Sequence, residues 1–252
     1  KYQGNLDVLR GISILLVVFY HLKLDILSYR IFPGGYLGVD IFFVISGYLI
    51  SSIITKNIEN GKFDFKYFFL RRFLRIVPVY IFVIFITLVF GYFILLHSDL
   101  YHLARSSGSA ILFLSNIFFF YFLNDYYNPE AIFNPLLHTW SLAVEIQFYI
   151  LFPFLFVFIK KFIKQTYLPL LIIGLMSLLI SEVGSYVEPR INFFGLQSRI
   201  WEFFLGYFIF FFKDKTNISL NNLIKYLLYF AMVLCAMLFD ENSRHPSLIT
   251  FV

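Results

Sequence analysis

The sequence predicts an all-α, polytopic transmembrane helical bundle. Of its 252 residues, 60% are hydrophobic and 14% are charged, whereas soluble domains average about 25% charged residues. The mean hydropathy is +0.80. The apolar runs have the length of membrane-spanning helices and exceed that of membrane strands. Together these observations indicate an integral membrane protein.

Charge and cysteine content narrow the class. The formal net charge is +5, but the basic residues cluster at segment ends, which indicates loop bias rather than a nucleic-acid surface. We therefore expect contact with membrane lipid and no nucleic-acid partner. The single cysteine, Cys235, excludes an intrachain disulfide. No set of cysteines and histidines has metal-ligand spacing, so we expect no metal site.

The chain shows no fixed-period repeat and no low-complexity linker, so we expect one domain over residues 1–252. It begins with Lys rather than Met and ends in what looks like a new apolar run. We therefore expect a piece of a longer protein, truncated at both ends. About eight membrane segments are expected, at roughly 6–27, 35–55, 76–96, 107–124, 141–160, 167–184, 195–212 and 223–239.

The first segment is apolar but carries ionisable residues. His21 lies eleven positions after Arg10, which is about three helical turns, so both lie on one face roughly 16 Å apart. Ile14 and Val17 lie between them on that face. Ionisable groups at such depth cost about 2.5–3.5 kcal/mol each and persist where they face a bundle interior or a cavity. This helix is therefore the first functional-site hypothesis.

The second segment begins at a glycine-rich stretch and carries Asp40 into the apolar run. A bland alternative is that Asp40 is only a helix N-terminal charge favoured by the helix dipole. The glycines remove side-chain bulk, so we expect close helix approach rather than a phosphate-binding loop. These glycines are Gly34, Gly35, Gly38 and Gly47.

The third segment follows the most basic loop, which we place in the cytoplasm. Arg71, Arg72 and Arg75 fall within about one helical turn, with Pro78 just beyond. They have two open interpretations, as plain positive-inside anchors or as a binding site. The other basic residues of this loop are Lys56, Lys62 and Lys66.

Topology poses a parity problem. Further basic clusters lie at 160–164 and 213–225, and cytoplasmic clusters must be separated by even numbers of spans. Three apolar segments separate the first cluster from the second. Residues 107–124 are polar at both ends and interrupted by Ser115 and Asn116, so we favour a re-entrant segment. The alternative places the lysines at 160–164 outside the cell.

The fifth segment opens with polar residues at helical spacing. His138, Ser141 and Glu145 are three and four residues apart, so they share one helix face. Glu145 lies well inside an apolar frame, where a structural hydrogen bond to a neighbouring helix is the bland alternative. For His138 and Ser141 the bland alternative is helix capping.

Farther along, Arg199 and Glu202 are three residues apart and are expected to form a structural intrahelical pair. His97, His102 and His245 have loop positions, and we expect them at the surface.

Five separate stretches, taken in order, resemble one family. They are LDVLRGISILLVVFYH, GVDIFFVISGYLI, RRFLRIVPVY, HTWSLAVEIQFYILFP and SRIWEFFLGYF, within about residues 5–210. The chain resembles the acyltransferase-3 family of membrane O-acyltransferases, which modify bacterial surface polysaccharides. The resemblance implies transfer of an acyl group, usually acetyl from acetyl-CoA, to a glycan hydroxyl. It also implies about ten spans in a bacterial inner membrane, against about eight here. Some members carry a periplasmic esterase-like domain, so a fused or separate periplasmic partner is an open expectation.

The resemblance assigns roles residue by residue. His21, separated from Arg10 by ten intervening residues, is the expected catalytic residue, with Asp40 and Glu145 as candidate catalytic carboxylates. Arg72 and Arg75 are expected near the CoA donor, and we add Arg10 and Arg71 to that set. His138, Trp140 and Ser141 are expected to bind the acceptor, while Arg199 and Glu202 fall in the last motif.

Acyl transfer to a hydroxyl explains these residue types. Histidine titrates nearest neutrality, so His21 suits a general base, and a carboxylate orients such a base. His21 as the acyl carrier is the other option. Guanidinium groups match the phosphates of CoA.

Two rival classes stay open. A proton-coupled transporter or flippase would use Asp40, Glu145 and His21 as a proton relay. A non-catalytic membrane scaffold would need none of the buried ionisable residues.

Overall fold

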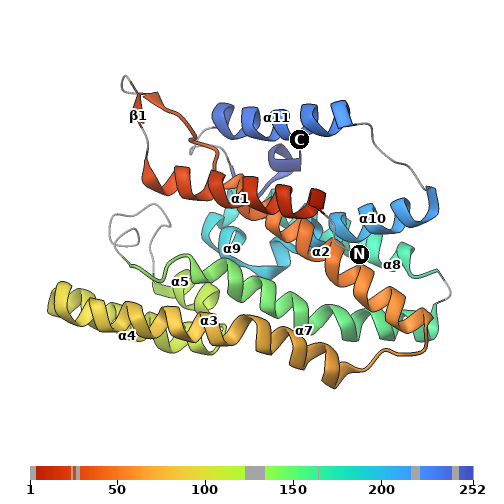
Figure 1. The fold of residues 1–252 in the computed structure, drawn as a ribbon, viewed down its shortest axis with the longest axis horizontal. Coiled ribbons are helices and arrows are strands. Elements are labelled where there is room, and N and C mark those ends of the chain that lie inside the picture. Colours follow the sequence, from red (N-terminus) through yellow and green to blue (C-terminus); the bar gives the residue numbers. More distant parts are fainter. Residues whose placement is uncertain are drawn as a thin grey trace.

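The computed structural model describes residues 4–23, 25–26, 29–122, 134–163, 165–216, 222–239 and 244–251. This part of the chain is a bundle of long helices that run along its longest axis, which confirms the predicted fold class (Figure 1). Two-residue strands β1 (Asp25–Ile26) and β2 (Tyr29–Arg30) form an antiparallel hairpin after the first helix. The helices are α1 (Gly4–Leu22), α2 (Leu37–Glu59), α3 (Phe65–Ile94), α4 (His97–Ile111), α5 (Ser115–Phe122), α7 (Thr139–Phe162), α8 (Tyr167–Val187), α9 (Pro189–Phe194), η1 (Leu196–Ser198), α10 (Ile200–Thr216), α11 (Asn222–Leu238) and η2 (Leu248–Phe251).

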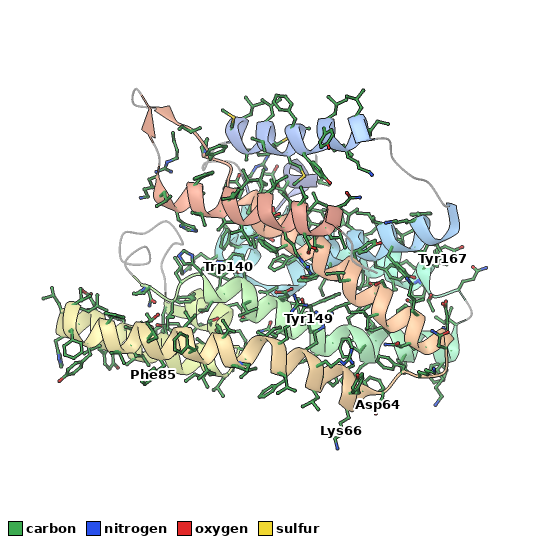
Figure 2. The ribbon with its side chains drawn as sticks, viewed as in Figure 1. Asp64, Lys66, Phe85, Trp140, Tyr149 and Tyr167 are labelled. Atoms are coloured by element: carbon green, nitrogen blue, oxygen red, sulfur yellow. The ribbon has the colours of Figure 1, made fainter. Side chains whose placement is uncertain are left out.

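Five of the described helices are long and apolar enough to cross a membrane, namely α1, α2, α3, α7 and α8. The apolar face of α3 is open to the surroundings, and Phe85 is 60% exposed and projects from it (Figure 2). Such exposure is costly in water but favourable against lipid tails. The chain is therefore a multi-pass membrane protein.

Helix α3 begins earlier than the predicted segment 76–96. The Asp64 side chain accepts hydrogen bonds from the backbone N–H groups of Lys66 and Tyr67, at 2.8 and 3.4 Å, and so caps the helix. The arginines at 71, 72 and 75 consequently stand on the helix itself rather than in the preceding loop.

Residues 107–122 do not form one crossing helix. Helix α4 ends at Ile111, Phe113 takes a left-handed conformation with φ of 55°, and α5 starts at Ser115. At 1.5 Å per residue, α4 and α5 are about 22 and 12 Å long, too short for a bilayer core of about 30 Å. This agrees with the re-entrant segment favoured at 107–124, of which residues 123–124 lie outside the described part.

The basic ends of several helices meet at one end of the bundle, which we call the basic end (Figure 1). Lys56, near the end of α2, lies over the Phe210 ring of α10, and Lys213 donates to the Tyr48 hydroxyl at 3.4 Å. Phe65, at the start of α3, stacks on Phe154 of α7 at 4.9 Å.

Lys160 and Lys161 lie in the last turn of α7, which ends at this basic end, and this favours one side of the membrane for both basic clusters. Their side of the membrane stays a prediction. Lys164 lies outside the described residues.

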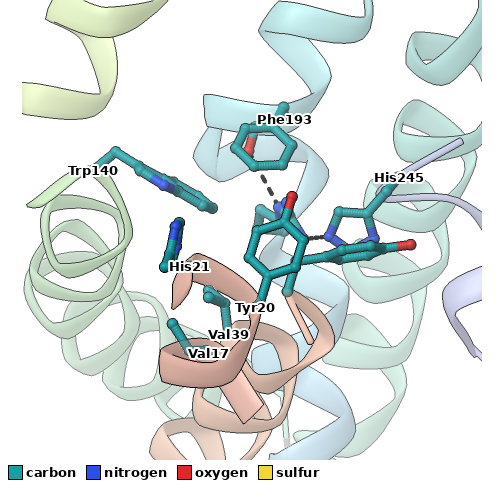
Figure 3. A pocket seen from close by; sticks show the side chains of 9 residues that line it. Val17, Tyr20, His21, Val39, Trp140, Phe193 and His245 are labelled. Atoms are coloured by element: carbon teal, nitrogen blue, oxygen red, sulfur yellow. Dashed lines mark hydrogen bonds between the residues drawn. The ribbon is translucent and has the colours of Figure 1, made fainter. Parts of the chain in front are cut away.

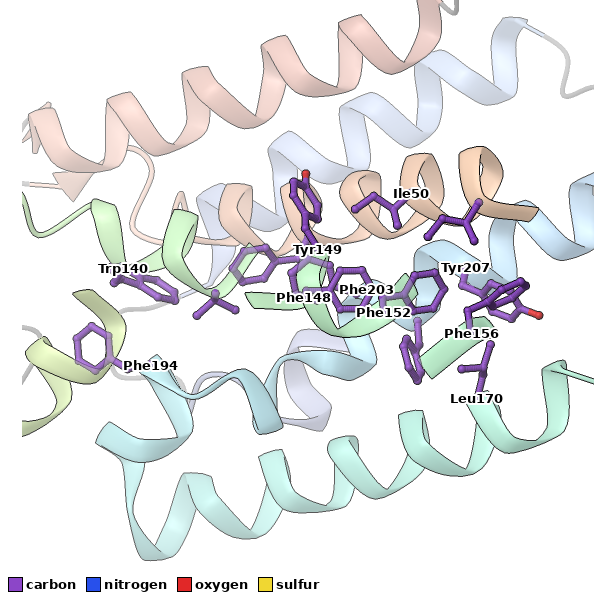
Figure 4. Packing of buried hydrophobic residues seen from close by; sticks show 14 of the residues in the cluster. Ile50, Trp140, Phe148, Tyr149, Phe152, Phe156, Leu170, Phe194, Phe203 and Tyr207 are labelled. Carbon is purple, nitrogen blue, oxygen red and sulfur yellow. The ribbon is translucent and has the colours of Figure 1, made fainter. Parts of the chain in front are cut away.

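Helix α2 packs most extensively against α10, and glycines let their backbones touch. A Cβ on Gly47 would overlap the backbone oxygen of Phe203, and one on Gly206 would overlap that of Val44. Next to this contact, the rings of Phe43, Phe203 and Phe148 form a stack in the aromatic core (Figure 4). Close approach at the predicted Gly47 is thereby confirmed, and it holds α2, which carries Asp40, against α10, which Arg199 immediately precedes.

Replacing Gly47 by Ala is expected to destabilise the protein by about 1–3 kcal/mol, because the new methyl group must push two helix backbones apart. Gly11→Ala is the matched control, since nothing lies within 4 Å of a Cβ built there. Gly11→Ala should stabilise the helix by up to about 1 kcal/mol. Thermal unfolding in detergent measures both. Equal changes in unfolding temperature, of the same sign in both variants, would contradict the backbone contact between α2 and α10 at Gly47.

Candidate active site

Two neighbouring cavities lie between α1, α2 and α7. The smaller, which we call the histidine chamber, has a volume of about 20 Å³ (Figure 3). The larger, which we call the long cavity, has a volume of about 260 Å³. The histidine chamber is lined by Val17, Tyr20, His21, Tyr36, Val39, Trp140, Phe193, Arg199 and His245. The long cavity is lined by Ile14, Val17, Val18, Val39, Phe42, Phe43, Ser141, Leu142 and Glu145.

The predicted polar face of α1 faces these cavities. Ile14 lines the long cavity, Val17 lines both cavities and His21 lines the histidine chamber. Arg10 lies one helical turn before Ile14, and its Nη1 donates to the Asp7 carboxylate at 3.3 Å. Helical periodicity alone thus placed one side of the cavities correctly.

His21 meets a second imidazole. Its ring centroid lies 4.3 Å from that of His138, edge to face, and both rings keep exposed surface. His138 immediately precedes α7 and makes no side-chain capping bond. Burial lowers the pKa of His138, so this imidazole is neutral at neutral pH.

The two candidate catalytic carboxylates lie elsewhere. Among the described residues, no hydrogen bond joins His21 to Asp40 or Glu145. Orientation of His21 by either carboxylate stays a prediction.

Asp40 belongs to a buried ion cluster around Arg199. Arg199 is fully buried, and its Nη1 donates to Asp40 Oδ1 at 2.8 Å and to Glu202 Oε1 at 3.0 Å. The expected Arg199–Glu202 pair is confirmed and extended by Asp40. The arginine also lies over the rings of Trp140 and Phe193, at 5.5 and 5.3 Å. The cluster thereby ties α10 to α2.

His245 is the fourth member of this cluster, so its expected surface position is wrong. Its side chain is 5% exposed, and its Nε2 lies 3.1 Å from Arg199 Nη1. Nε2 also lies 3.4 Å from Asp40 Oδ1, so it can accept from the guanidinium or donate to the carboxylate, depending on the tautomer. Burial and the Arg199 charge lower the pKa of His245, which keeps it neutral. Spacing could not reveal this contact because it joins distant segments, whereas His97 and His102 are exposed as expected.

Glu145 is the centre of a second polar group. Ser46 of α2 and Tyr149 of α7 both donate hydroxyl hydrogen bonds to its Oε1. Neither partner was predicted from the sequence, although Tyr149 follows Glu145 by four residues and so shares its helix face. Ser141 lines the long cavity beside Glu145, which confirms the predicted face.

The three arginines of α3 point in different directions. The Arg72 guanidinium lies 4.9 Å from the Tyr149 ring centroid, within electrostatic range of Glu145, Arg10 and Arg75. Arg71 instead stacks on Tyr67 at 4.3 Å, and Arg75 is exposed. Arg72 is therefore the arginine that adjoins the Glu145 group.

A pair of amides anchors the junction of α4 and α5 to the site. Gln147 Nε2 donates to Asn116 Oδ1 at 2.9 Å and to the backbone oxygen of Phe113 at 3.2 Å. Asn116 donates in turn to the backbone oxygen of Phe194 at 3.1 Å. Asn116 interrupts an apolar run in the sequence, and in the structure its side chain is paired with that of Gln147.

These features define a class of protein, a multi-pass helical membrane protein with a histidine-lined chamber next to a cavity lined by a carboxyl group, which an arginine adjoins. In the described part of the chain, no group of three or more histidine, cysteine or acidic residues could hold a metal ion. The chain belongs to the acyltransferase-3 family, because the family model described as "Acyltransferase domain" matches residues 3–245.

Two relatives illustrate the membership. O-acetyltransferase OatA of Staphylococcus aureus is 36% identical over 212 residues, which cover 82% of this chain and 34% of OatA. "Putative peptidoglycan O-acetyltransferase YrhL" of Bacillus subtilis is 31% identical over 259 residues, covering 96% of this chain and 40% of YrhL. The chain thus matches only 34–40% of the length of these relatives. No solved structure matches it significantly.

Proposed function

We propose that this chain is the membrane domain of an O-acyltransferase that moves an acetyl group from cytoplasmic acetyl-CoA to a glycan hydroxyl. One observation carries the proposal. His21 and Glu145 line two cavities that share the walls Val17 and Val39, and Arg72 adjoins the Glu145 group. A thioester entering beside the arginines would thus have a lined route to an imidazole.

In the proposed reaction, the C–S bond of the thioester breaks and a C–O ester bond to the glycan forms. As general base, His21 takes the hydroxyl proton and passes it to the departing CoA thiolate. As acyl carrier, His21 first attacks the thioester carbon and releases CoA, and the glycan hydroxyl then displaces the imidazole. Both routes yield one ester and one CoA thiol.

The basic end suits the donor. Lysines and arginines concentrate there, which supports a cytoplasmic location at a bacterial inner membrane. Arg72, with Arg10 and Arg75 within electrostatic range of it, would bind the phosphates of CoA, whereas Arg71, predicted to join this set, stacks on Tyr67 instead.

The opposite side suits the acceptor, because His21 and His138 keep exposed surface there. The name of YrhL makes peptidoglycan the first acceptor to test. His138, Trp140 and Ser141 keep their predicted role beside it, and a periplasmic partner domain would deliver the glycan.

A proton-coupled transporter has less support. A proton relay through Asp40, Glu145 and His21 needs these groups connected, and no hydrogen bond among the described residues connects them.

The test uses full-length protein in proteoliposomes with acetyl-CoA labelled in the acetyl group and peptidoglycan fragments outside. Labelled ester on the fragments, with one CoA thiol released per ester, is the expected result. Arg72→Ala should raise KM for acetyl-CoA about tenfold to a hundredfold, the typical effect of one lost charge-assisted contact. Arg71→Ala is the matched control and should change KM less, because Arg71 stacks away on Tyr67. If folded protein forms no labelled ester, the acyltransferase assignment is refuted.

A further inference from the structure

We propose that the histidine chamber is the acyl pocket of this protein, and that Val17 and Val39 restrict its donors to acetyl. The inference rests on the proposed function and adds the residues that set acyl length.

The volume of the chamber is the first argument. About 20 Å³ is room for roughly one water-sized group, since a water needs at least about 10–15 Å³. An acetyl group has one carbon beyond its carbonyl, and that methyl group is close to this size. Every further methylene of a longer acyl chain would need space that the chamber lacks.

The position of the two valines is the second argument. Val17 of α1 and Val39 of α2 line both cavities, so they form the partition between the chamber and the long cavity. Val18, the next residue along α1, lines the long cavity alone. An acyl group that reaches His21 from the long cavity must therefore pass the first two side chains and not the third.

The remaining walls cannot move aside easily. Tyr20, Tyr36, Trp140 and Phe193 are each less than 10% exposed and pack on one another, with Trp140 and Phe193 centroids 4.7 Å apart. Backbone contact also fixes α1 against α2, because a Cβ on Gly38 would overlap the backbone oxygen of Ser13. Close-packed walls of this kind resist expansion by even one methylene.

The chamber also offers a partner for the acyl carbonyl. Arg199 lines it, and its Nη2 has no hydrogen-bond partner among the described residues, whereas its Nη1 donates to Asp40 and Glu202. A carbonyl oxygen in the chamber would satisfy this buried donor. A purely apolar ligand would leave it unsatisfied.

The experiment compares acetyl-, propionyl- and butyryl-CoA as donors with full-length protein, and measures kcat/KM for each. Wild-type protein should prefer acetyl to propionyl by about 10- to 200-fold, the usual effect of one methylene in a tight pocket. Val17→Ala and Val39→Ala should each lower this preference at least tenfold. Val18→Ala, the matched control, should keep the wild-type preference.

Three outcomes are decisive. Equal use of butyryl-CoA and acetyl-CoA by wild-type protein would overturn the inference, and so would equal shifts in the Val17→Ala and Val18→Ala variants. If no donor is used at all, the proposed function fails rather than the acyl pocket. Thermal unfolding of each variant identifies loss of fold, and two partition valines leave a second variant if one does not fold.

Discussion

His21→Gln is expected to lower acyl transfer to the glycan by at least about 10²–10⁴-fold. The glutamine side chain can hydrogen-bond but can neither accept a proton near neutral pH nor carry an acyl group. The measurement is the rate of labelled ester formation with full-length protein in proteoliposomes. His102→Gln is the matched control, because His102 is an exposed histidine on α4 outside both cavities.

The same variant separates the two roles of His21. If His21 carries the acyl group, wild-type protein without acceptor should release one equivalent of CoA in a burst, and His21→Gln should show none. If His21 is only a base, neither protein shows a burst, yet transfer still fails in the variant. Full activity of folded His21→Gln would refute both roles.

Arg199→Met is expected to destabilise the protein by about 3–5 kcal/mol. The substitution leaves the carboxyl groups of Asp40 and Glu202 buried without their cation, and an uncompensated buried charge is costly. Thermal or denaturant unfolding in detergent measures the loss.

The triple variant Arg199→Met, Asp40→Leu, Glu202→Met should recover much of that stability, because it removes all three charges together. Recovery would show that the cost lies in the stranded carboxyl groups and not in lost arginine packing. A single variant as stable as wild type would contradict the ion cluster. The exposed pair Arg10 and Asp7 supplies the control, since Arg10→Met should change stability by less than about 1 kcal/mol.

Part of the site could be predicted because its residues lie on a single helix, where spacing along the sequence decides which side chains share a face. Periodicity placed His21 and Val17 on one face of α1 and Ser141 with Glu145 on one face of α7, and both faces line the cavities. Spacing of three likewise predicted the Arg199–Glu202 pair.

The remaining contacts join residues far apart in the chain. His21 meets His138, Asp40 meets Arg199, and Glu145 meets Ser46, and none of these pairs shares a helix. His245 shows the same limit most clearly, because its position in the sequence suggested solvent and its partner is a buried arginine. Which side chains meet across helices depends on crossing geometry, for which local spacing has no signal.

The sequence by itself determined that this is a multi-pass membrane helical bundle of the acyltransferase-3 family, because hydropathy, charge placement and motif order are properties of the linear chain. Tertiary structure alone decided that His21 and His245 line one chamber, that Arg72 and not Arg71 adjoins Glu145, and that two valines line both cavities. The physical reason is close packing at glycines such as Gly47 and Gly38, which sets how near the helices approach and so which side chains can touch.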